Sequence, residues 1–468
     1  MSSQSALYQK HIHLVGIGGT GMSAIAQVLL ERGCTVSGSD QAESPGVEQL
    51  RSQGVRIHIG HSASWIVGAD IVAISSAIRD DNPEVVAARQ HGIPVLKRSA
   101  FIGELLAGYY TIAVAGTHGK TTTTAMIAFI LSEAGLAPGF IIGGVSRNLG
   151  TNARSGSGPY FVIEADEYDR MFLGINPDLA IVTNLEMDHP DCFGGIEELT
   201  EAFTAFLRRV PPSGYIIVNG DEGRIREMLM GLELHNQKLE NFGFAPDANW
   251  RPTDIVPNDL GGHTFSVWHE RTLLGPFELQ VPGIHNVLNA LAAIAATTEV
   301  GVSTSHIQDS LARFEGTARR FEHKGTESGV IVIDDYAHHP TEIRATLAAA
   351  HVRYAGSEIW AIFQPHTYSR FRALLPEFAR SFALADHVIV TDIFASRELN
   401  TEGVHAQAII DVMDHPEARY IPDFTAVVRY LMEHVRPGDV CITLGAGDCY
   451  LIGEELLADL RAHPLATR

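Results

Sequence analysis

The feature that most limits what this chain can fold into is a glycine-rich segment, VAGTHGKTTTTAM, at residues 114–126. An apolar run, YYTIAVA, precedes it, and a stretch with helical spacing, AMIAFILSEAG, follows it. A glycine turn between a strand and a helix leaves backbone N–H groups pointing outward at the positive end of the helix. The segment therefore predicts an α/β domain that binds phosphate at this corner, where Lys120 adds positive charge.

The segment departs from the G-x-x-x-x-G-K-[ST] pattern at one position, because Val114 stands where the first glycine would be. An ordinary glycine-containing turn would leave four consecutive threonines unexplained, since threonine suits caps and metal sites better than helix interiors. We therefore expect ATP phosphates on this loop. Its residues are Gly116, Thr117, His118, Gly119, Lys120, Thr121 and Thr122.

Strands and helices alternate along the chain in three blocks, and 468 residues are too many for one core. We expect an α/β protein of three domains, at residues 1–108, 109–316 and 317–468. The first and third are predicted to be Rossmann-like parallel sheets. The second is predicted to be a P-loop-type α/β domain with an antiparallel section from about Trp250 to Leu279. Ligands bind beyond the carboxyl ends of the strands in such sheets.

Composition excludes several classes of protein. The formal net charge of −21 argues against a nucleic-acid partner, which requires a broad basic surface. No window approaches the roughly 18 uninterrupted apolar residues of a membrane span, and no secretory leader is recognisable, so we expect a cytoplasmic protein with no membrane partner. The four cysteines lack C-x-x-C spacing, which predicts reduced thiols rather than a zinc site or disulfides.

A second glycine-rich segment, GIGGTGMS, follows the first predicted strand, and Asp40 ends the next one. This pattern predicts a tight turn that lets a diphosphate approach the backbone, with the acid near a ribose or base. A nicotinamide-dependent oxidoreductase shares the pattern, and glycines needed only for helix–strand packing would also produce it. The candidate residues are Gly16, Gly18, Gly19, Thr20, Gly21, Met22 and Ser23.

Carboxylates gather where two later strands end. FVIEADEYD carries four of them, and Glu164 is favoured as an Mg²⁺ ligand because it is the first to leave the apolar strand. The later carboxylates are equally compatible with simple solvation. TNLEMDHPD adds Asp188 and His189, and His189 is either a second metal ligand or a structural histidine.

Paired amides in GIHNVLNALAAIAA suit the edge of an adenine, because Asn286 and Asn289 face the same way on a helix. Capping and a partly buried polar face explain the same spacing. In the third block, polar residues follow two apolar strands, in the segments IDDYAHHPTEI and FQPHTYSRFR. These residues either bind a carboxylate substrate or are ordinary surface residues. These groups are Asp335, Tyr336, His338, His339, His366, Arg370 and Arg372.

Eleven segments, taken in order along the chain, resemble the Mur ligases. One such segment would be weak support, but eleven in the same order are specific. They are GIGGTGMS, VSGSD, SSAI, GTHGKTTTT, EADEYD, NLEMDHPD, GIHNVLNALAA, FEGTARRFE, DDYAHHPTEI, FQPHTYSR and GAGD.

The resemblance implies an ATP-dependent ligase that joins L-alanine to the lactyl carboxylate of UDP-N-acetylmuramate through an acyl phosphate. It implies Lys120 on the β- and γ-phosphates, Thr121 and Glu164 on one Mg²⁺, and His189 on a second. It also implies that the nucleotide is met by His285, Asn286, Asn289, Arg320 and Asp335.

For the other substrates, the resemblance implies that the first domain binds UDP through its glycine loop, Asp40, Ser75 and Ser76. The incoming amino acid would meet groups of the third domain, namely Tyr336, His338 and Arg370. The residues expected to carry the chemistry are Lys120, Glu164, His189, His338 and Arg370. A monomer or weak homodimer is expected.

Three departures from the family pattern leave alternatives open. Thr367 stands where many members have arginine, and Tyr168 stands where alanine-adding members commonly have serine. Tyr168 resembles the related ligase that recycles murein tripeptide, so that activity is the nearest alternative. Some members carry a carbamylated lysine near the second metal, but only Lys238 lies between Lys120 and Lys324. A catalytically silent nucleotide-sugar sensor is a further alternative.

Overall fold

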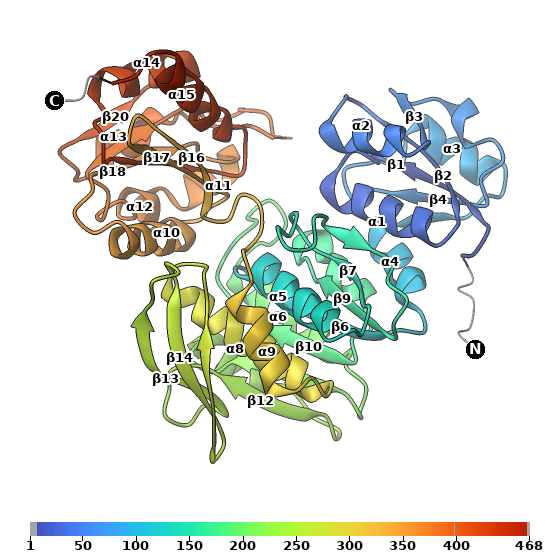
Figure 1. The fold of residues 1–468 in the computed structure, drawn as a ribbon. Helices are drawn as coiled ribbons and strands as arrows, with labels where there is room; N and C mark the ends of the chain where they lie inside the picture. The colour runs from blue at the N-terminus through green and yellow to red at the C-terminus, as the bar shows by residue number, and fades with distance from the viewer. Residues whose placement is uncertain (1–6, 397, 466–468) are drawn as a thin grey trace.

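The structure, a computed structural model, describes residues 7–396 and 398–465. These residues form three α/β domains in chain order, coloured blue, cyan to yellow, and orange to red in Figure 1. Each domain is built on its own sheet, of five, ten and six strands respectively. The predicted three-domain fold is confirmed.

The first sheet is parallel throughout, with strand order β3-β2-β1-β4-β5. The order reverses beside β1, and a doubly wound sheet opens a ligand crevice at the carboxyl ends there. The strands are β1 (His11–Val15), β2 (Thr35–Asp40), β3 (Arg56–Ile59), β4 (Ile71–Ile74) and β5 (Val95–Lys97). The helices are α1 (Thr20–Glu31), α2 (Pro45–Ser52), η1 (Ala63–Ile66), α3 (Pro83–Gln90) and α4 (Arg98–Leu106).

The middle sheet has strand order β15-β14-β13-β12-β11-β10-β6-β9-β7-β8. Its parallel part contains β6 (Tyr110–Ala115), β7 (Gly139–Ile141), β9 (Tyr160–Glu164), β10 (Leu179–Val182), β11 (Tyr215–Asn219) and β12 (Lys238–Phe242), and β8 (Ala153–Arg154) runs antiparallel at one edge. The predicted antiparallel section consists of β13 (Trp250–Pro257), β14 (His263–His269) and β15 (Thr272–Glu278). The helices are α5 (Lys120–Glu133), η2 (Tyr168–Gly174), α6 (Ile196–Leu207), α7 (Gly223–Met230), α8 (Ile284–Glu299) and α9 (Thr304–Ala312).

The third sheet has strand order β16-β17-β21-β18-β19-β20, and only the edge strand β16 runs antiparallel to its neighbour. Its strands are β16 (Glu322–Glu327), β17 (Val330–Asp335), β18 (Ile359–Phe363), β19 (His387–Val390), β20 (Ala418–Tyr420) and β21 (Val440–Leu444). Its helices are α10 (Pro340–Arg353), α11 (Tyr368–Ala373), α12 (Leu375–Ala379), α13 (Gln407–Val412), α14 (Phe424–His434) and α15 (Tyr450–Ala462).

Helix α5 is buried along most of its length, because residues 121–131 are all buried. Its apolar residues share one core with the similarly buried α8 and with alternate residues of β6. The burial fixes the start of α5, and with it the glycine-rich loop, against the middle sheet.

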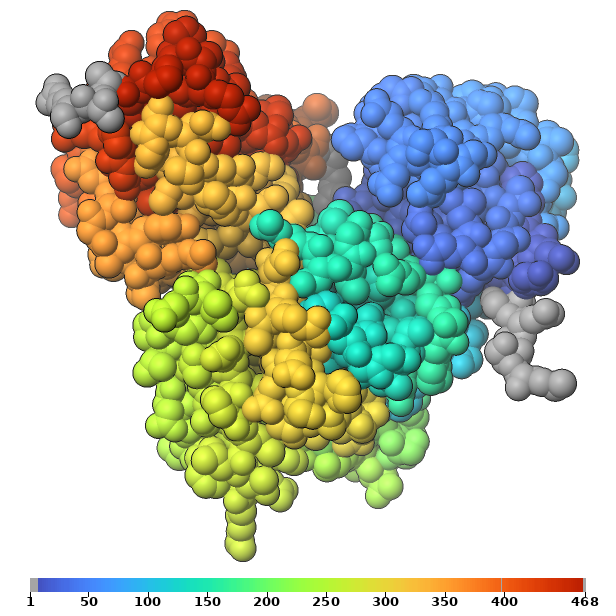
Figure 2. Space-filling model, viewed as in Figure 1, coloured from blue at the N-terminus to red at the C-terminus, as the bar shows by residue number. Residues whose placement is uncertain are grey.

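The molecule has three lobes, one for each domain, and the middle domain contacts both of the others (Figure 2). Within residues 7–396 and 398–465, no helix is both long enough and apolar enough to cross a bilayer. All four cysteines are free thiols, and Cys192 is the one among them that is not fully buried.

Candidate active site

The phosphate loop connects the end of β6 to the start of α5, as the sequence predicted. Gly116 and Gly119 have φ angles of +136° and +78°, which favour glycine. A Cβ atom would also lie 2.0 Å from Thr183 Oγ1 at the first glycine and 2.5 Å from Asn289 Oδ1 at the second. The amide of His118 donates to Asn184 Oδ1 at 2.8 Å. Close packing therefore fixes the loop before any ligand binds.

Lys120 lies beneath this loop with its charge already paired. Its Nζ donates to the Gly116 carbonyl at 2.5 Å and lies 2.9 Å from Glu167 Oε2. Burial opposes the charge on Lys120, but Glu167, Glu164 and Asp166 outweigh that effect and raise its pKa. Glu167 is 1% exposed, so the expectation that carboxylates after Glu164 are simply solvated is wrong for this residue.

Glu164 and Thr121 meet at the end of β9. Thr121 Oγ1 donates to Glu164 Oε1 at 3.2 Å, and the Gly143 amide donates to Glu164 Oε2 at 2.7 Å. A carboxylate and a hydroxyl are oxygen ligands of the kind that Mg²⁺ prefers. The donor set beside the phosphate loop therefore fits the predicted Mg²⁺ site.

His189 lies where the middle and third domains meet. Arg370, from α11 of the third domain, donates through Nε to Asp188 Oδ1 at 2.7 Å and places Nη2 3.5 Å from His189 Nδ1. Burial would raise the pKa of Asp188, but Arg370 and His189 hold it well below its usual range. The Tyr168 ring lies 5.1 Å from the His189 ring, and its hydroxyl donates to Asp191.

The backbone is strained in the same region. His189 and Thr367 have φ angles of +55° and +64°. Non-glycine residues rarely adopt this conformation, which concentrates at functional sites. Thr367, the position that departs from the family pattern, directly precedes α11 and so helps to place Arg370.

A cavity opens beside the phosphate loop, between the middle and third domains. Residues of both domains line it, including Phe242, and Thr317 Oγ1 in its wall is buried with no hydrogen-bond partner among the described residues. Such an atom is available to a ligand. Nine predicted nucleotide contacts line this cavity: His118, Gly119, Thr121, Thr122, His285, Asn286, Asn289, Arg320 and Asp335. Gly116, Thr117 and Lys120, which are also predicted nucleotide contacts, are not among the residues that line it.

Hydrogen bonds within the protein hold the side chains of the two predicted adenine contacts, Asn286 and Asn289, in place. Asn289 Nδ2 donates to Asn286 Oδ1 at 3.0 Å, and Asn286 Nδ2 donates to the Pro282 carbonyl at 2.7 Å. Burial, assisted by the Arg320 charge, lowers the pKa of His285 to about 4, so its imidazole is neutral near pH 7. Burial also raises the pKa of Asp335 to about 6.

In the first domain, the second glycine loop lies at the carboxyl end of β1. Gly16 has a φ of +82°, and a Cβ atom there would lie 2.9 Å from Ser75 Cβ. The Gly18 amide donates to Asp40 Oδ2 at 2.8 Å. The Met22 side chain is 2% exposed in the core, so the predicted contact of Met22 with a ligand would come from its backbone. Ser76 and Thr20 are exposed.

The polar segments of the third domain separate into two groups. His338 Nδ1 lies 2.9 Å from the Tyr336 carbonyl oxygen, and its ring contacts the His366 ring near Arg370. Burial and the Arg370 charge lower the pKa of His338 to about 3. Arg372 instead lies on the surface in an ion pair with Glu402.

Three family profiles match the chain in the order of its domains. They are the Mur ligase family catalytic domain at residues 11–110, the Mur ligase middle domain at 114–297 and the Mur ligase glutamate ligase domain at 319–447. The chain belongs to the Mur ligase family. It is therefore an ATP-dependent ligase that acts on small molecules.

Curated relatives resemble this Mur ligase along almost its whole length. The UDP-N-acetylmuramate--L-alanine ligase of Alkaliphilus metalliredigens is 44% identical over 96% of this chain and 97% of its own length. The enzyme of the same name from Geobacter sp. is also 44% identical, over 97% and 98%.

Solved structures agree with this assignment. UDP-N-acetylmuramate-alanine ligase from Thermotoga maritima matches with a TM-score of 0.82 and 30% identity, over 97% of this chain and 99% of its own. A murein peptide ligase from Psychrobacter arcticus matches with a TM-score of 0.71 and 28% identity, over 98% and 100%.

The sequence analysis did not identify a network that joins two domains of this Mur ligase. His118 of the phosphate loop lies 3.4 Å from Glu186 and 3.3 Å from Glu342, which belongs to α10 of the third domain. Thr341 Oγ1 donates to Glu186 Oε2 at 2.7 Å. Burial opposes the charge on His118, but hydrogen bonds to the two glutamates raise its pKa to about 9. The P-T-E sequence is typical of the first turn of a helix and could have identified Glu342 as a capping residue.

Proposed function

We propose that this Mur ligase joins L-alanine to the lactyl carboxylate of UDP-N-acetylmuramate and converts ATP to ADP and phosphate. The observation that carries the proposal is the arrangement around Lys120. The phosphate loop, the Glu164–Thr121 pair and the adenine-facing amides share one region of the middle domain, and Arg370 reaches it from the third domain. Curated relatives that carry this activity in their names match 96% and 97% of the chain.

The chemistry explains why so many charges converge. A carboxylate is a poor electrophile, so ATP first transfers its γ-phosphoryl group to the carboxylate oxygen, and the amine then attacks the acyl phosphate and displaces phosphate. Phosphoryl transfer between two anions requires positioning and charge neutralisation. The Lys120 ammonium supplies a fixed positive charge, since neighbouring carboxylates keep it protonated.

Residues of the chain would also hold the metal and the amine. Thr121 and Glu164 would hold one Mg²⁺ and His189 a second, and these ions when bound neutralise phosphate charge. The carboxylate of L-alanine would pair with the Arg370 guanidinium, which here pairs with Asp188. His338 is neutral near pH 7 because its pKa is about 3, so it can accept a hydrogen bond from the amine.

One observation favours a second candidate, the ligase that adds an intact murein tripeptide. Tyr168 contacts His189, at the place where the sequence resembles that ligase. The Psychrobacter arcticus murein peptide ligase also shares the fold. Support for L-alanine as the amine comes from the curated alanine ligases that match almost the whole chain, and from a TM-score of 0.82 to the Thermotoga maritima alanine ligase against 0.71 to that protein.

A phosphate-release assay tests the proposal. The full chain is incubated with ATP, Mg²⁺ and UDP-N-acetylmuramate, and then L-alanine, glycine, L-serine or the tripeptide is added. Release with L-alanine supports the proposal. Release with the tripeptide alone would select the recycling activity, and no release with any amine would overturn both.

We also propose domain boundaries near residues 108 and 316, a cytoplasmic location, and a monomer or weak homodimer. The first boundary agrees with the gap between the family profiles that end at 110 and begin at 114. Ultracentrifugation of the full chain tests the oligomeric state.

A further inference from the structure

Three side chains that commonly bind metals meet beside the ATP cavity, where the middle domain contacts the third. They are His118 of the phosphate loop, Glu186 after β10, and His339, which directly precedes α10. One nitrogen or oxygen atom from each lies within 4.8 Å of the atoms from the other two. None of the three residues is among those predicted to hold Mg²⁺, so the group is a separate cluster.

The spacing between the ligand atoms suits one bound ion. Glu186 Oε2 lies 3.4 Å from His118 Nε2 and 3.6 Å from His339 Nδ1. Two ligands of a tetrahedral Zn²⁺ ion, each about 2.0–2.1 Å from the metal, are roughly 3.3–3.4 Å apart. The two histidine rings also lie close together, with 4.6 Å between their centroids. The side chains are therefore arranged almost as they would be around an ion.

Neighbouring groups would hold two of these ligands in place. His118 Nδ1 lies 3.3 Å from Glu342 Oε1, and a histidine that binds a metal commonly donates its other ring N–H to a carboxylate. Thr341 Oγ1 donates to Glu186 Oε2 at 2.7 Å and orients that carboxylate. Both supporting residues belong to α10, so an ion at this position would be held by the middle and third domains together.

The imidazole of His339 is poorly bonded for a buried group. The Thr341 amide donates to its Nδ1 at 3.3 Å, which is longer than usual and indicates that Nδ1 carries a lone pair. Nε2 is buried and has no hydrogen-bond partner among the described residues, although the side chain is only 6% exposed. Buried polar groups normally have a good partner, so this ring is available to a ligand.

The ligand set indicates the kind of ion. Two imidazoles and one carboxylate suit a transition-metal dication such as Zn²⁺ or Co²⁺, whereas Mg²⁺ prefers oxygen ligands. His118 and Glu186 line the ATP cavity, so water or a phosphate oxygen can take the fourth position on the ion. The ion has to displace the proton of His118, and binding should therefore release that proton.

We propose that His118, Glu186 and His339 form a transition-metal site that joins the middle domain to the third. An ion bound there fixes the phosphate loop to the start of α10. Domain movement during turnover would have to break this connection, so Zn²⁺ should inhibit the ligase reversibly. The inhibition rests on the proposed function, but the metal site can be tested without turnover.

The test is a titration of the full chain with Co²⁺ in the absence of Mg²⁺ and nucleotide. Tetrahedral Co²⁺ absorbs visible light far more strongly than octahedral Co²⁺, so the spectrum reports the geometry of the site. We expect one equivalent to bind with the tetrahedral spectrum. Affinity should fall at least about tenfold in His339→Asn, in which asparagine can still cap α10, and similarly in Glu186→Gln. His351→Asn, an exposed position on the same helix, is the matched control and should bind like the wild-type chain.

A second group of possible ligands provides the competing explanation for bound Co²⁺. It consists of Glu240, His269 and Glu270 in the middle domain. Loss of the spectrum in His269→Asn but not in His339→Asn would assign the ion to that group and overturn the inference. Absence of a tetrahedral spectrum from the wild-type chain, or equal affinity in the wild-type chain and the folded His339→Asn and Glu186→Gln variants, would overturn it as well.

Phosphate release measures the effect of the ion on turnover. With Mg²⁺ in excess, the Zn²⁺ concentration for half-maximal inhibition should rise at least about tenfold in His339→Asn and stay unchanged in His351→Asn. Each variant is compared with its own rate without Zn²⁺. Equal sensitivity of the two variants would overturn the inhibitory role. Failure of the wild-type chain to release phosphate without Zn²⁺ would instead count against the proposed function, because the Co²⁺ titration does not depend on turnover.

Discussion

Glu167 is buried, the side chain of its partner Lys120 is 12% exposed, and each charge is stabilised by the other. The same holds for Arg370 and Asp188, whose ion pair crosses from the third domain to the middle domain. Removing one partner of such a pair leaves an uncompensated buried charge, which typically costs about 3–5 kcal/mol. The active site therefore contains positively charged side chains, Lys120 and Arg370, with which substrate phosphates and carboxylates can pair on binding.

Glu164 provides the first prediction at this scale. In Glu164→Gln, the Mg²⁺ concentration that gives half-maximal phosphate release should rise at least about tenfold, because an amide is a weaker Mg²⁺ ligand than a carboxylate. Asp169→Asn is the matched control, since Asp169 is an exposed carboxylate of the same segment. An unchanged Mg²⁺ titration in Glu164→Gln would remove Glu164 from the metal site.

Residue types at strand ends predicted which groups of the active site come together, but not how each is buried. Lys120, Thr121 and Glu164 meet as expected because parallel strands bring their carboxyl ends to one edge. Glu167 is buried where it pairs with Lys120, and the chain just after it adopts left-handed conformations at Asp169 and Arg170, with φ of 52° and 51°. No local sequence signal specifies that turn.

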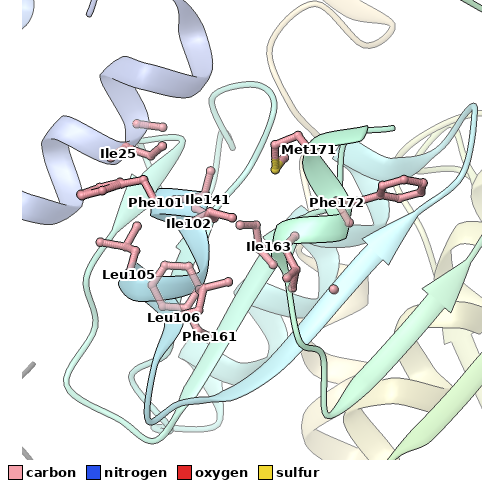
Figure 3. Close-up of a cluster of buried hydrophobic side chains, with 14 of the residues drawn as sticks. Ile25, Phe101, Ile102, Leu105, Leu106, Ile141, Phe161, Ile163, Met171 and Phe172 are labelled. Carbon is pink, nitrogen blue, oxygen red and sulfur yellow. The ribbon is translucent and has the colours of Figure 1, made fainter. Parts of the chain in front are cut away.

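Helix α4 shows how an element can belong to one domain by sequence and to another by packing. Its position after β5 placed it in the first block, yet its apolar side chains lie in a core shared with β9 and η2. A sequence pattern identifies an amphipathic face but not the surface that covers it. The packing of α4 against the middle domain is therefore visible only in the structure (Figure 3).

Gly174→Ala tests the close contact of α4. The new methyl group would lie 1.7 Å from the Ser99 carbonyl oxygen, so α4 must shift, and overpacking of this kind costs about 1–3 kcal/mol. We expect a lower midpoint of urea unfolding. Gly223→Ala is the control, because a Cβ atom there meets nothing within 4 Å. Equal midpoints for the two variants would contradict the packing described here.

Strands were predictable where they are apolar and not where they are charged. The buried runs of β6, β10 and β21 follow directly from the sequence. Strand β12 was missed because it carries Lys238 and Glu240. Glu240 is buried with partners, since Trp250 Nε1 donates to it at 2.6 Å and Lys238 Nζ lies 3.1 Å from it. Trp250 lies on the next strand, β13. The burial of Glu240 therefore depends on the pairing of two strands and cannot be predicted from the sequence of β12 alone.

Across the whole molecule, His118 connects the phosphate loop to the third domain. Its protonated imidazole lies between Glu186 of the middle domain and Glu342 of α10. The two domains are therefore held together beside the ATP cavity by a charge that can be titrated. Closure around ATP would have to rearrange this network, and water must be kept from an acyl phosphate.

The pH dependence of stability tests this connection. The folded pKa of His118 is about 9, above its ordinary value of 6.5, so its contribution is complete below pH 6.5 and is lost as the pH rises through 9. The free energy of unfolding of the wild-type chain should exceed that of His118→Gln by a margin that shrinks with pH. We expect this margin to be about 3 kcal/mol larger at pH 6 than at pH 10. Calorimetric unfolding at the two pH values measures this difference. A constant difference would show that the histidine carries no charge in the folded state.

The most direct measurement of the central claim is phosphate release by Lys120→Met in the presence of ATP, Mg²⁺, UDP-N-acetylmuramate and L-alanine. Loss of the fixed cation should reduce release at least about a hundredfold while UDP binding to the first domain stays intact. Lys238→Met, which removes a lysine whose side chain is 58% exposed in the same domain, should retain activity. Undiminished release by a folded Lys120→Met variant would contradict the account.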